Sequence, residues 1–270
     1  MKSKSQIINN FFYGGRPLVA HSLVFLTLGV ISLLQIPINF IMKKYSMDTG
    51  ILINEFAVIA GIPLIIAASL HLDITKLFPL KKPAFNMIII ASLLTLMIAL
   101  LIDYTAVATE FFFPLPKEFR EIMNRLMEFK GASGFIYKLF ILCIVPGICE
   151  EIFFRGFCQT SLTAKWGKTV AIIITGFLFA VMHGNPWYLH LYFILGVLLS
   201  FVYAFTQTLW VPIVCHIINN AWTFINHSLK IEFPLNIPIY GNIILVITVV
   251  LFAMILIKKF KTHQNPSDEA

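Results

Sequence analysis

The chain has 270 residues, of which 59% are apolar and only 12% are charged. Soluble domains carry about 25% charged residues, so this composition excludes a water-soluble fold and predicts a polytopic, all-α membrane protein that has the lipid bilayer as its partner. The net charge of +7 would suggest nucleic acid as a partner of a soluble protein, but here the basic residues flank apolar segments, which argues against nucleic acid.

Apolar segments of about 20 residues, the length of a membrane-spanning helix, occur eight times along the chain. The predicted spans are residues 18–42, 51–71, 85–103, 135–150, 169–184, 188–206, 209–227 and 239–257. Between the third and fourth spans, residues 116–127 carry apolar residues at helical spacing with charges between them. This pattern predicts an amphipathic helix lying at the membrane interface.

Eight spans place both termini on the same side of the membrane. If that side is the cytoplasm, 12 of the 20 Lys and Arg residues lie inside, which agrees with the positive-inside rule. These residues are Lys2, Lys4, Arg16, Lys76, Lys81, Lys82, Arg155, Lys165, Lys168, Lys258, Lys259 and Lys261. We therefore expect a multi-pass protein of the cell membrane with both termini in the cytoplasm.

Charged side chains at membrane depth are costly, so they are candidates for function. Glu151 and Arg155 are four residues apart with the acid on the N-terminal side, a spacing that predicts an ion pair within one helix. Glu150 is rotated by about 100° on the helix and stays outside this pair. Its carboxylate is therefore a candidate general base, and the alternative is a salt-bridge cluster at the end of the fourth span.

Two histidines and one asparagine are candidate site residues in the stretch of residues 169–229, which contains no Asp, Glu, Lys or Arg. His183 ends the fifth span, while His216 and Asn220 lie four residues apart on one face of the seventh. At membrane depth these groups need hydrogen-bond partners, so we predict that they line one site with Glu150. Asn219 points elsewhere on the helix, and we predict a packing role for it.

These residues admit two chemistries. In the first, Glu150 and His183 activate a water molecule for attack on a carbonyl, while His216 and Asn220 donate hydrogen bonds to the developing oxyanion. In the second, Glu150, His183 and His216 bind zinc, which polarises the carbonyl and activates the water. The residues alone leave both chemistries open.

Other hydrolase patterns are absent from the sequence, which has no H-E-x-x-H, G-x-S-x-G or G-x-G-D motif. The cysteines lie in or beside apolar segments and no C-x-x-C pair occurs. We therefore predict that they are buried packing residues rather than nucleophiles or metal ligands. They are Cys143, Cys149, Cys158 and Cys215.

Three short motifs occur in order on separate apolar spans. They are E-E-x-x-x-R at residues 150–155, F-x-x-x-H at residues 179–183 and H-x-x-x-N at residues 216–220. Together they resemble the CPBP family of CAAX-protease and bacteriocin-processing intramembrane peptidases, also called the abortive-infection or type II CAAX prenyl endopeptidase family. The resemblance covers about residues 135–225.

This resemblance implies an all-α fold of about eight membrane helices around an intramembrane cavity. It implies a catalytic core at residues 135–228, between N-terminal spans at 1–134 and a last span with a basic tail at 229–270. The implied activity is cleavage of membrane-associated peptides or proteins, of CAAX type or in bacteriocin processing.

The resemblance also implies a role for each candidate residue. Glu150 and His183 would activate the water, His216 and Asn220 would form the oxyanion site, and Glu151 with Arg155 would support it. It favours a glutamate-dependent mechanism that requires no cofactor, with a zinc metalloprotease as the alternative.

Two other classes of protein compete with the peptidase. A non-catalytic membrane immunity or scaffold protein would bind a bacteriocin or a partner helix without turnover, but retention of all four candidate catalytic residues argues against it. A small transporter would use the Glu and His residues as a proton relay. No inverted repeat with paired broken helices is visible in the sequence, which disfavours the transporter.

Overall fold

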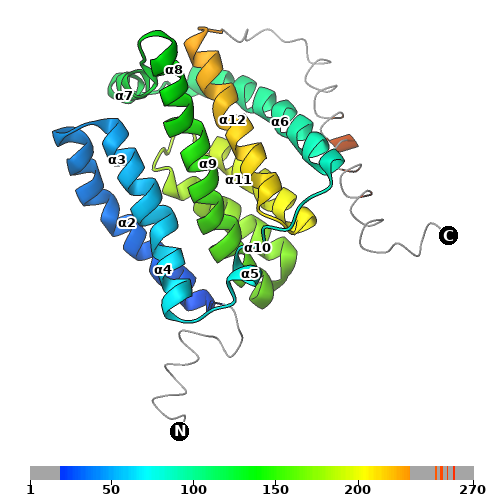
Figure 1. The fold of residues 1–270 in the computed structure, drawn as a ribbon. Coiled ribbons are helices and arrows are strands. Elements are labelled where there is room, and N and C mark those ends of the chain that lie inside the picture. Colours follow the sequence, from blue (N-terminus) through cyan, green and yellow to red (C-terminus); the bar gives the residue numbers. More distant parts are fainter. Residues whose placement is uncertain (1–18, 232–246, 248–249, 252–253, 255–257, 259–270) are drawn as a thin grey trace.

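Long apolar helices make up the described part of the chain, and Figure 1 shows them packed side by side. This computed structural model describes residues 19–231 and, further on, residues 247, 250–251, 254 and 258. Every regular element among these residues is a helix, which confirms the predicted all-α class. The helices are α2 His21–Lys44, α3 Met47–Ile53, η1 Asn54–Ala60, α4 Gly61–Ser69, α5 Ile74–Leu77, α6 Phe85–Phe112, α7 Lys117–Met127, α8 Gly131–Leu139, η2 Phe140–Ile144, α9 Val145–Glu151, η3 Ile152–Gln159, α10 Thr160–Met182, α11 Leu189–Thr206 and α12 Trp210–Ser228.

Five helices among the described residues are long and apolar enough to cross a membrane, which confirms a multi-pass membrane protein. They are His21–Lys44, Met47–Ser69, Phe85–Phe112, Gly131–Met182 and Leu189–Thr206. The fourth of these contains the two spans predicted at 135–150 and 169–184. The span predicted at 209–227 corresponds to α12, whose His and Asn residues make it less apolar. The span predicted at 239–257 falls largely outside the described residues.

The helix of the fourth predicted span does not end at Glu150 and Glu151, where we predicted the end of that span. Both residues lie inside a longer helix, because α9 continues through η3 into α10. The fully buried side chains of Phe153 and Phe157 anchor this continuation within the bundle. The helix kinks at Gly167, whose φ of 80° lies in a region that glycine adopts without steric cost.

The predicted amphipathic helix at residues 116–127 is confirmed as α7. None of its residues is buried in the structure. Figure 1 shows α7 near α8 at the upper end of the molecule, while α5 lies at the lower end. The position of α7 at a membrane interface stays a prediction, as does the cytoplasmic side of the lower end.

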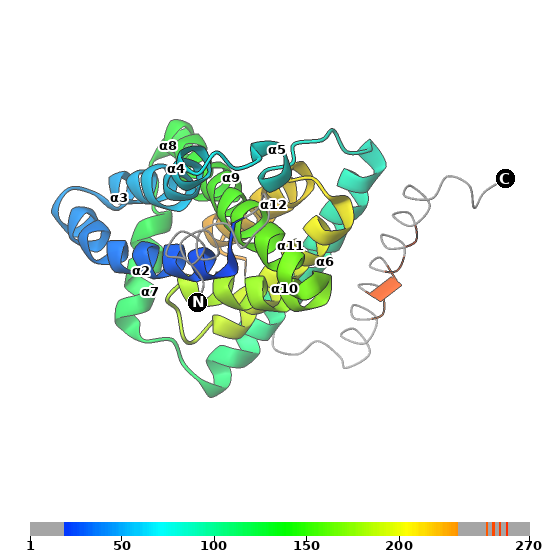
Figure 2. The same ribbon diagram turned by 90° about the horizontal axis from the view of Figure 1, so that it is seen from below.

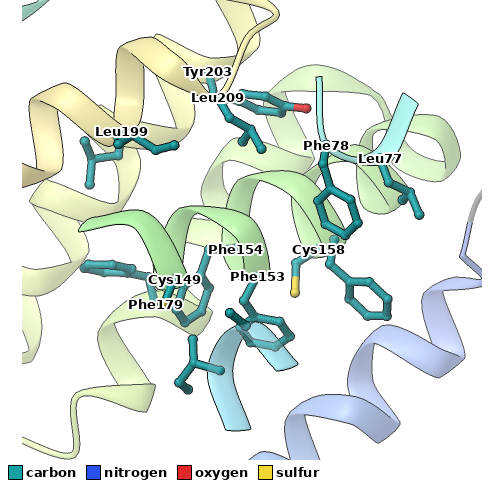
Figure 3. Packing of buried hydrophobic residues seen from close by; sticks show 14 of the residues in the cluster. Leu77, Phe78, Cys149, Phe153, Phe154, Cys158, Phe179, Leu199, Tyr203 and Leu209 are labelled. Carbon is teal, nitrogen blue, oxygen red and sulfur yellow. The ribbon is translucent and has the colours of Figure 1, made fainter. Parts of the chain in front are cut away.

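The apolar core lies where η3 packs against α10 and α11. Figure 3 shows Phe153, Phe154 and Phe179 in this core, and the ring centroids of Phe154 and Phe179 are 5.2 Å apart. Inside a membrane such contacts stabilise the fold through close packing rather than through removal of apolar surface from water. The four cysteines are buried and unpaired, as predicted: Cys143, Cys149, Cys158 and Cys215.

Helices α10 and α11 form the centre of the bundle, between α2 and α6 (Figure 2). They cross at two glycines, where a Cβ added to Gly196 would lie only 2.7 Å from the carbonyl oxygen of Gly176. Small residues allow membrane helices to approach this closely. The approach brings the carbonyl of Gly196 within reach of Arg155, so the packing of these helices positions the candidate site.

Candidate functional site

Three π-helical turns, η1, η2 and η3, surround the predicted glutamates. Glu55 lies on η1, Arg155 lies on η3, and α9 with Glu150 and Glu151 runs between η2 and η3. A π-helical turn holds an extra residue compared with an α-helical turn, and such turns occur frequently at functional sites. The local backbone is therefore unusual at the point where the sequence places charged residues in an apolar bundle.

Glu151, Arg155 and His216 form a hydrogen-bonded network at the centre of the bundle. Nη1 of Arg155 donates to Oε1 of Glu151 at 2.6 Å, and both side chains are 0% exposed. Nδ1 of His216 lies 2.8 Å from the same oxygen. Nη2 of Arg155 also donates to the carbonyl oxygen of Gly196 at 3.1 Å. The predicted ion pair is confirmed, and the network joins η3 to α11 and α12.

The ring of Phe179, the first residue of the F-x-x-x-H motif, lies among the charged groups of the site. Its centroid is 4.8 Å from the guanidinium carbon of Arg155, a distance at which a cation–π interaction stabilises the buried charge. The same ring lies 4.5 Å from the ring of His183 and 5.6 Å from that of His216. Phe179 therefore packs against both histidines and holds them apart.

Glu150 stays outside the ion pair of Glu151, as predicted. Its side chain is 15% exposed, and Oε2 is buried without a hydrogen-bond partner among the described residues. This oxygen lies 4.0 Å from Nε2 of His216. At such a separation both atoms can hydrogen-bond to one small group placed between them, such as a water molecule or a substrate oxygen.

His183 is close to the same carboxylate. Its Nδ1 donates to the carbonyl oxygen of Phe179 at 2.8 Å, because a carbonyl can only accept. The ring stacks on Tyr192 with centroids 4.1 Å apart. Glu150 interacts electrostatically with His183 across the site. The structure therefore brings together three of the four predicted catalytic residues, Glu150, His183 and His216.

The loop that follows His183 is held in place by its own hydrogen bonds. Oδ1 of Asn185 accepts from the backbone N–H groups of Trp187 and Tyr188 at 3.1 and 3.2 Å. The hydroxyl of Tyr188 donates to Glu110 of α6. Burial and this carboxylate raise the pKa of Tyr188, so the hydroxyl keeps its proton and remains a donor. These contacts fix the chain directly after the catalytic candidate.

Asn220 lies against η2 rather than in contact with the other candidates. Its amide nitrogen donates to the carbonyl oxygen of Leu142 at 3.3 Å, and Asn219 donates to its oxygen at 3.4 Å. In the described structure no hydrogen bond joins Asn220 to Glu150 or to either histidine. Its role at the oxyanion stays a prediction.

Glu55 is a buried acid of the site that our sequence analysis missed. Its side chain interacts electrostatically with Glu150, and Nδ2 of Asn54 donates to its Oε1 at 3.2 Å. Asn54 in turn accepts from Gln35 of α2 at 3.0 Å. Oε2 of Glu55 is buried without a partner among the described residues. The signal was present, because Glu55 is a charged residue inside the span predicted at 51–71.

Among the described residues no group of three His, Cys, Asp or Glu side chains is placed to hold a metal. Nδ1 of His183 is bonded to Phe179, and Nδ1 of His216 is bonded to Glu151. Both bonds leave Nε2 of the ring free, as in histidines that bind a metal, so the choice between the glutamate-dependent and the zinc mechanism stays a prediction.

Comparison with known proteins finds similarity over the central part of the chain. A family model described as type II CAAX prenyl endopeptidase Rce1-like matches residues 132–222. The chain is 33% identical over 87 residues to "Putative membrane peptidase YdiL" of Bacillus subtilis, covering 32% of this chain and 36% of that protein. It is 31% identical over 100 residues to "Membrane-embedded CAAX protease MroQ" of Staphylococcus aureus, covering 35% and 40%.

A third relative, "UPF0177 protein YxdF" of Lactococcus lactis, is 34% identical over 91 residues, covering 31% of this chain and 50% of that protein. The chain thus spans between about a third and a half of the length of these curated relatives. No solved structure matches it significantly. The segment that matches the family model includes all three motifs, at residues 150–155, 179–183 and 216–220. The predicted resemblance to the CPBP family is therefore confirmed over residues 132–222, where the chain is similar to type II CAAX prenyl endopeptidases.

Proposed function

We propose that this protein is an intramembrane endopeptidase that hydrolyses peptide bonds of membrane-associated substrates. One observation carries the proposal: Glu150 has an unpartnered carboxylate oxygen that lies 4.0 Å from Nε2 of His216 inside a membrane bundle, and Glu150 also interacts electrostatically with His183. An unpaired acid at this depth costs folding free energy, so its presence indicates a function. Its neighbour Glu151 is paired with Arg155, so the two acids have different surroundings.

The hydrogen bonds of the two histidines support different roles for them. In a neutral His183 ring, Nδ1 carries the hydrogen given to Phe179, and Nε2 keeps a lone pair that can accept a proton. His216 donates through Nδ1 to the carboxylate of Glu151, which orients the ring so that Nε2 lies 4.0 Å from Oε2 of Glu150. We therefore assign proton acceptance to Glu150 with His183, and hydrogen-bond donation to His216.

The proposed reaction proceeds through a tetrahedral intermediate. Glu150, assisted by His183, takes a proton from a water molecule, whose oxygen bonds to the carbonyl carbon of the peptide. The carbonyl oxygen gains the negative charge, and Nε2–H of His216 and the amide of Asn220 donate to it. When the C–N bond breaks, Glu150 returns the proton to the leaving nitrogen. The products are a carboxylic acid and an amine.

The substrate class that we favour is a CAAX-type, prenylated membrane protein. The matching family model and MroQ both carry CAAX proteolysis in their names, which supports this choice. A bacteriocin precursor is the second candidate, because the resembled family also processes such peptides. A membrane immunity or scaffold protein remains the non-catalytic alternative.

The test is turnover by the detergent-solubilised full chain on a library of membrane peptides that includes a prenylated CAAX peptide. Wild type is compared with Glu150→Ala and His183→Ala, each with and without a strong chelator. We expect cleavage by the wild type that resists the chelator and is lost in both variants.

Other outcomes would change the proposal in defined ways. Loss of cleavage on chelation, restored by zinc, would show that a metal takes part. Absence of turnover in a well-folded wild type, on both prenylated and unprenylated peptides, would favour the immunity or scaffold alternative. Cleavage that survives in Glu150→Ala would exclude Glu150 as the base.

A further inference from the structure

A second polar feature lies at the lower end of the bundle in Figure 1, away from the candidate active site. It is a cavity of about 760 Å³ between α5, α10 and the end of α11, with Lys76, Lys81 and Lys168 in its wall. Gln159, another residue of the wall, follows Glu150 by nine positions on one helix, which corresponds to about 13 Å along the axis. The cavity and the proposed active site are therefore separate.

Hydrogen bonds hold one wall of this cavity in place. The backbone N–H of Leu209 donates to the carbonyl oxygen of Pro79 at 2.8 Å, and Thr208 donates to that of Lys81 at 2.7 Å. The indole of Trp210 donates to the carbonyl oxygen of Leu80 at 3.2 Å. Trp210 is 46% exposed, and tryptophan is enriched at the boundary between membrane and water. These contacts indicate an ordered cavity at the level of the lipid headgroups.

The positive charge of the cavity comes mainly from two of its lysines. Lys76 forms an ion pair with Asp73 at 2.9 Å. Hydrogen bonds from Thr75 and Lys76 lower the pKa of Asp73 to about 2, so this acid stays ionised and offsets the charge of Lys76. Lys81 and Lys168 are exposed, and neither forms an ion pair within the described residues. An anion in the cavity would meet two uncompensated ammonium groups.

Gln159 adds an unused hydrogen-bond acceptor to the cavity wall. Its side chain is 1% exposed, and Nε2 donates to the carbonyl oxygen of Ser200 at 2.7 Å. Because that carbonyl can only accept, the amide orientation is fixed and Oε1 is left without a partner among the described residues. Buried polar atoms of this kind usually have partners, so Oε1 points to a ligand that carries a hydroxyl or amine donor.

The rest of the wall is apolar, with Ile74, Phe78, Leu80 and Ala204 among its residues. Phe78 and Tyr203, both labelled in Figure 3, lie in this wall. A free inorganic anion would gain nothing from these apolar groups, whereas a lipid would place its glycerol and upper acyl carbons against them. The combination of two lysines, one acceptor and apolar side chains matches an amphiphilic anion.

We propose that this cavity binds the headgroup of an anionic phospholipid, with the phosphodiester on Lys81 and Lys168 and a headgroup hydroxyl on Oε1 of Gln159. Basic pockets between membrane helices on the cytoplasmic side are suited to such headgroups. The lysines belong to the segments that the positive-inside rule assigns to the cytoplasm. Binding at this site does not depend on the proposed peptidase activity.

The experiment measures lipid binding to the detergent-solubilised full chain by native mass spectrometry. The probes are dioctanoyl phosphatidylglycerol, phosphatidylcholine of the same chain length, phosphatidylmethanol, which keeps the charge but lacks the headgroup hydroxyls, and inorganic phosphate. We expect phosphatidylglycerol to bind most tightly. The loss of one hydrogen bond should weaken phosphatidylmethanol about fivefold.

Two lysine variants test the electrostatic part of the site. Lys81→Gln and Lys168→Gln should each weaken phosphatidylglycerol binding about fivefold, and the double variant about 25-fold. Lys165→Gln is the matched control, because Lys165 is exposed on the same helix but does not line the cavity. It should change binding less than about twofold. All three lysines are exposed, so we expect each variant to fold, which size-exclusion chromatography and circular dichroism would check.

The following results would contradict the proposed lipid site or a part of it. Equal binding of phosphatidylglycerol and phosphatidylcholine, or an equal effect of Lys165→Gln, would overturn the anionic headgroup site. Inorganic phosphate that competes as well at the same concentration would assign the cavity to a free anion instead of a lipid. Equal binding of phosphatidylmethanol would remove Gln159 from the site. None of these results would bear on peptide cleavage.

Discussion

Glu150 and Glu151 are neighbours in the chain, yet their carboxylates have opposite surroundings. Oε1 of Glu151 is bonded to Arg155 at 2.6 Å and to His216 at 2.8 Å in a fully buried network. Glu150 lies on another face of the helix, where Oε2 has no hydrogen-bond partner among the described residues. One acid therefore holds helices together, and the other is left available for chemistry.

The difference follows from helix geometry and from which helices face each residue. Successive residues of a helix are rotated by about 100°. Glu151 therefore faces α12 and Arg155, whereas the side of the helix that carries Glu150 faces η1. On the η1 side the nearby residue is Glu55, and two carboxyl groups cannot form an ion pair. We infer that stability resides on the Glu151 side and reactivity on the Glu150 side.

Glu150→Gln should have the largest effect on turnover with the smallest effect on folding. Gln keeps the shape of the side chain but cannot accept the proton, so we expect turnover to fall about 100- to 10,000-fold. The free energy of unfolding should stay the same or rise, because position 150 no longer carries a charge inside the bundle. Peptide cleavage and thermal unfolding of one preparation measure both quantities.

Glu151→Gln is the matched control for this variant, because it leaves the charge of Arg155 without its ionised partner. It should lower the thermal stability clearly, whereas Glu150→Gln should not. The same loss of stability in both variants would contradict the division between the two acids.

Arg155→Met should give the largest loss of stability. It leaves the carboxylate of Glu151 buried without its cation, and such a loss costs about 3–5 kcal/mol of unfolding free energy. Arg155→Met combined with Glu151→Gln removes both charges and should recover more than half of that loss. Thermal or denaturant unfolding in detergent measures the effect. A double variant no more stable than Arg155→Met alone would mean that packing of the arginine, not its charge, matters.

Asn220→Ala tests the remaining predicted catalytic residue. If its amide donates to the oxyanion, turnover should fall about 100- to 1,000-fold with the affinity for substrate little changed. Asn219→Ala is the comparison, because we predict only a packing role for Asn219. Separate measurement of kcat and KM distinguishes a catalytic role from a packing role. A loss of stability without a loss of kcat in Asn220→Ala would assign this residue to the contact with Leu142 alone.

Local pattern was enough to predict much of the fold and the ion pair, because both depend on spacing along one helix. The spans predicted at 18–42 and 188–206 correspond to α2 and α11. Local pattern could not predict contacts between helices that are far apart in the sequence. His216 meets Glu151 across 65 positions of the chain, and Arg155 meets Gly196 across 41. The spacing of Glu151 and Arg155 implied a helix as far as Arg155, but it gave no sign that this helix would run on into α10, because buried phenylalanines decide this through tertiary packing.

Among these substitutions Glu55→Gln should have the smallest effect. It should raise the stability of the protein and lower its turnover. Gln keeps the hydrogen bond to Asn54 but replaces a buried carboxyl group whose Oε2 has no partner in the described structure. We expect the free energy of unfolding to rise by about 1 kcal/mol. Turnover should fall by less than about tenfold, because Glu55 lies beside Glu150 but takes no proton in the proposed reaction.

Thermal unfolding and cleavage of the Glu55→Gln protein would be measured beside wild type and Glu55→Ala. The Ala variant loses the bond to Asn54 as well, so it should be less stable than Glu55→Gln. If Glu55→Gln is both less stable and fully active, Glu55 is a structural residue of η1 and takes no part in tuning Glu150. A more stable and slower enzyme would instead indicate that the fold gives up stability to keep a second acid beside the reactive one.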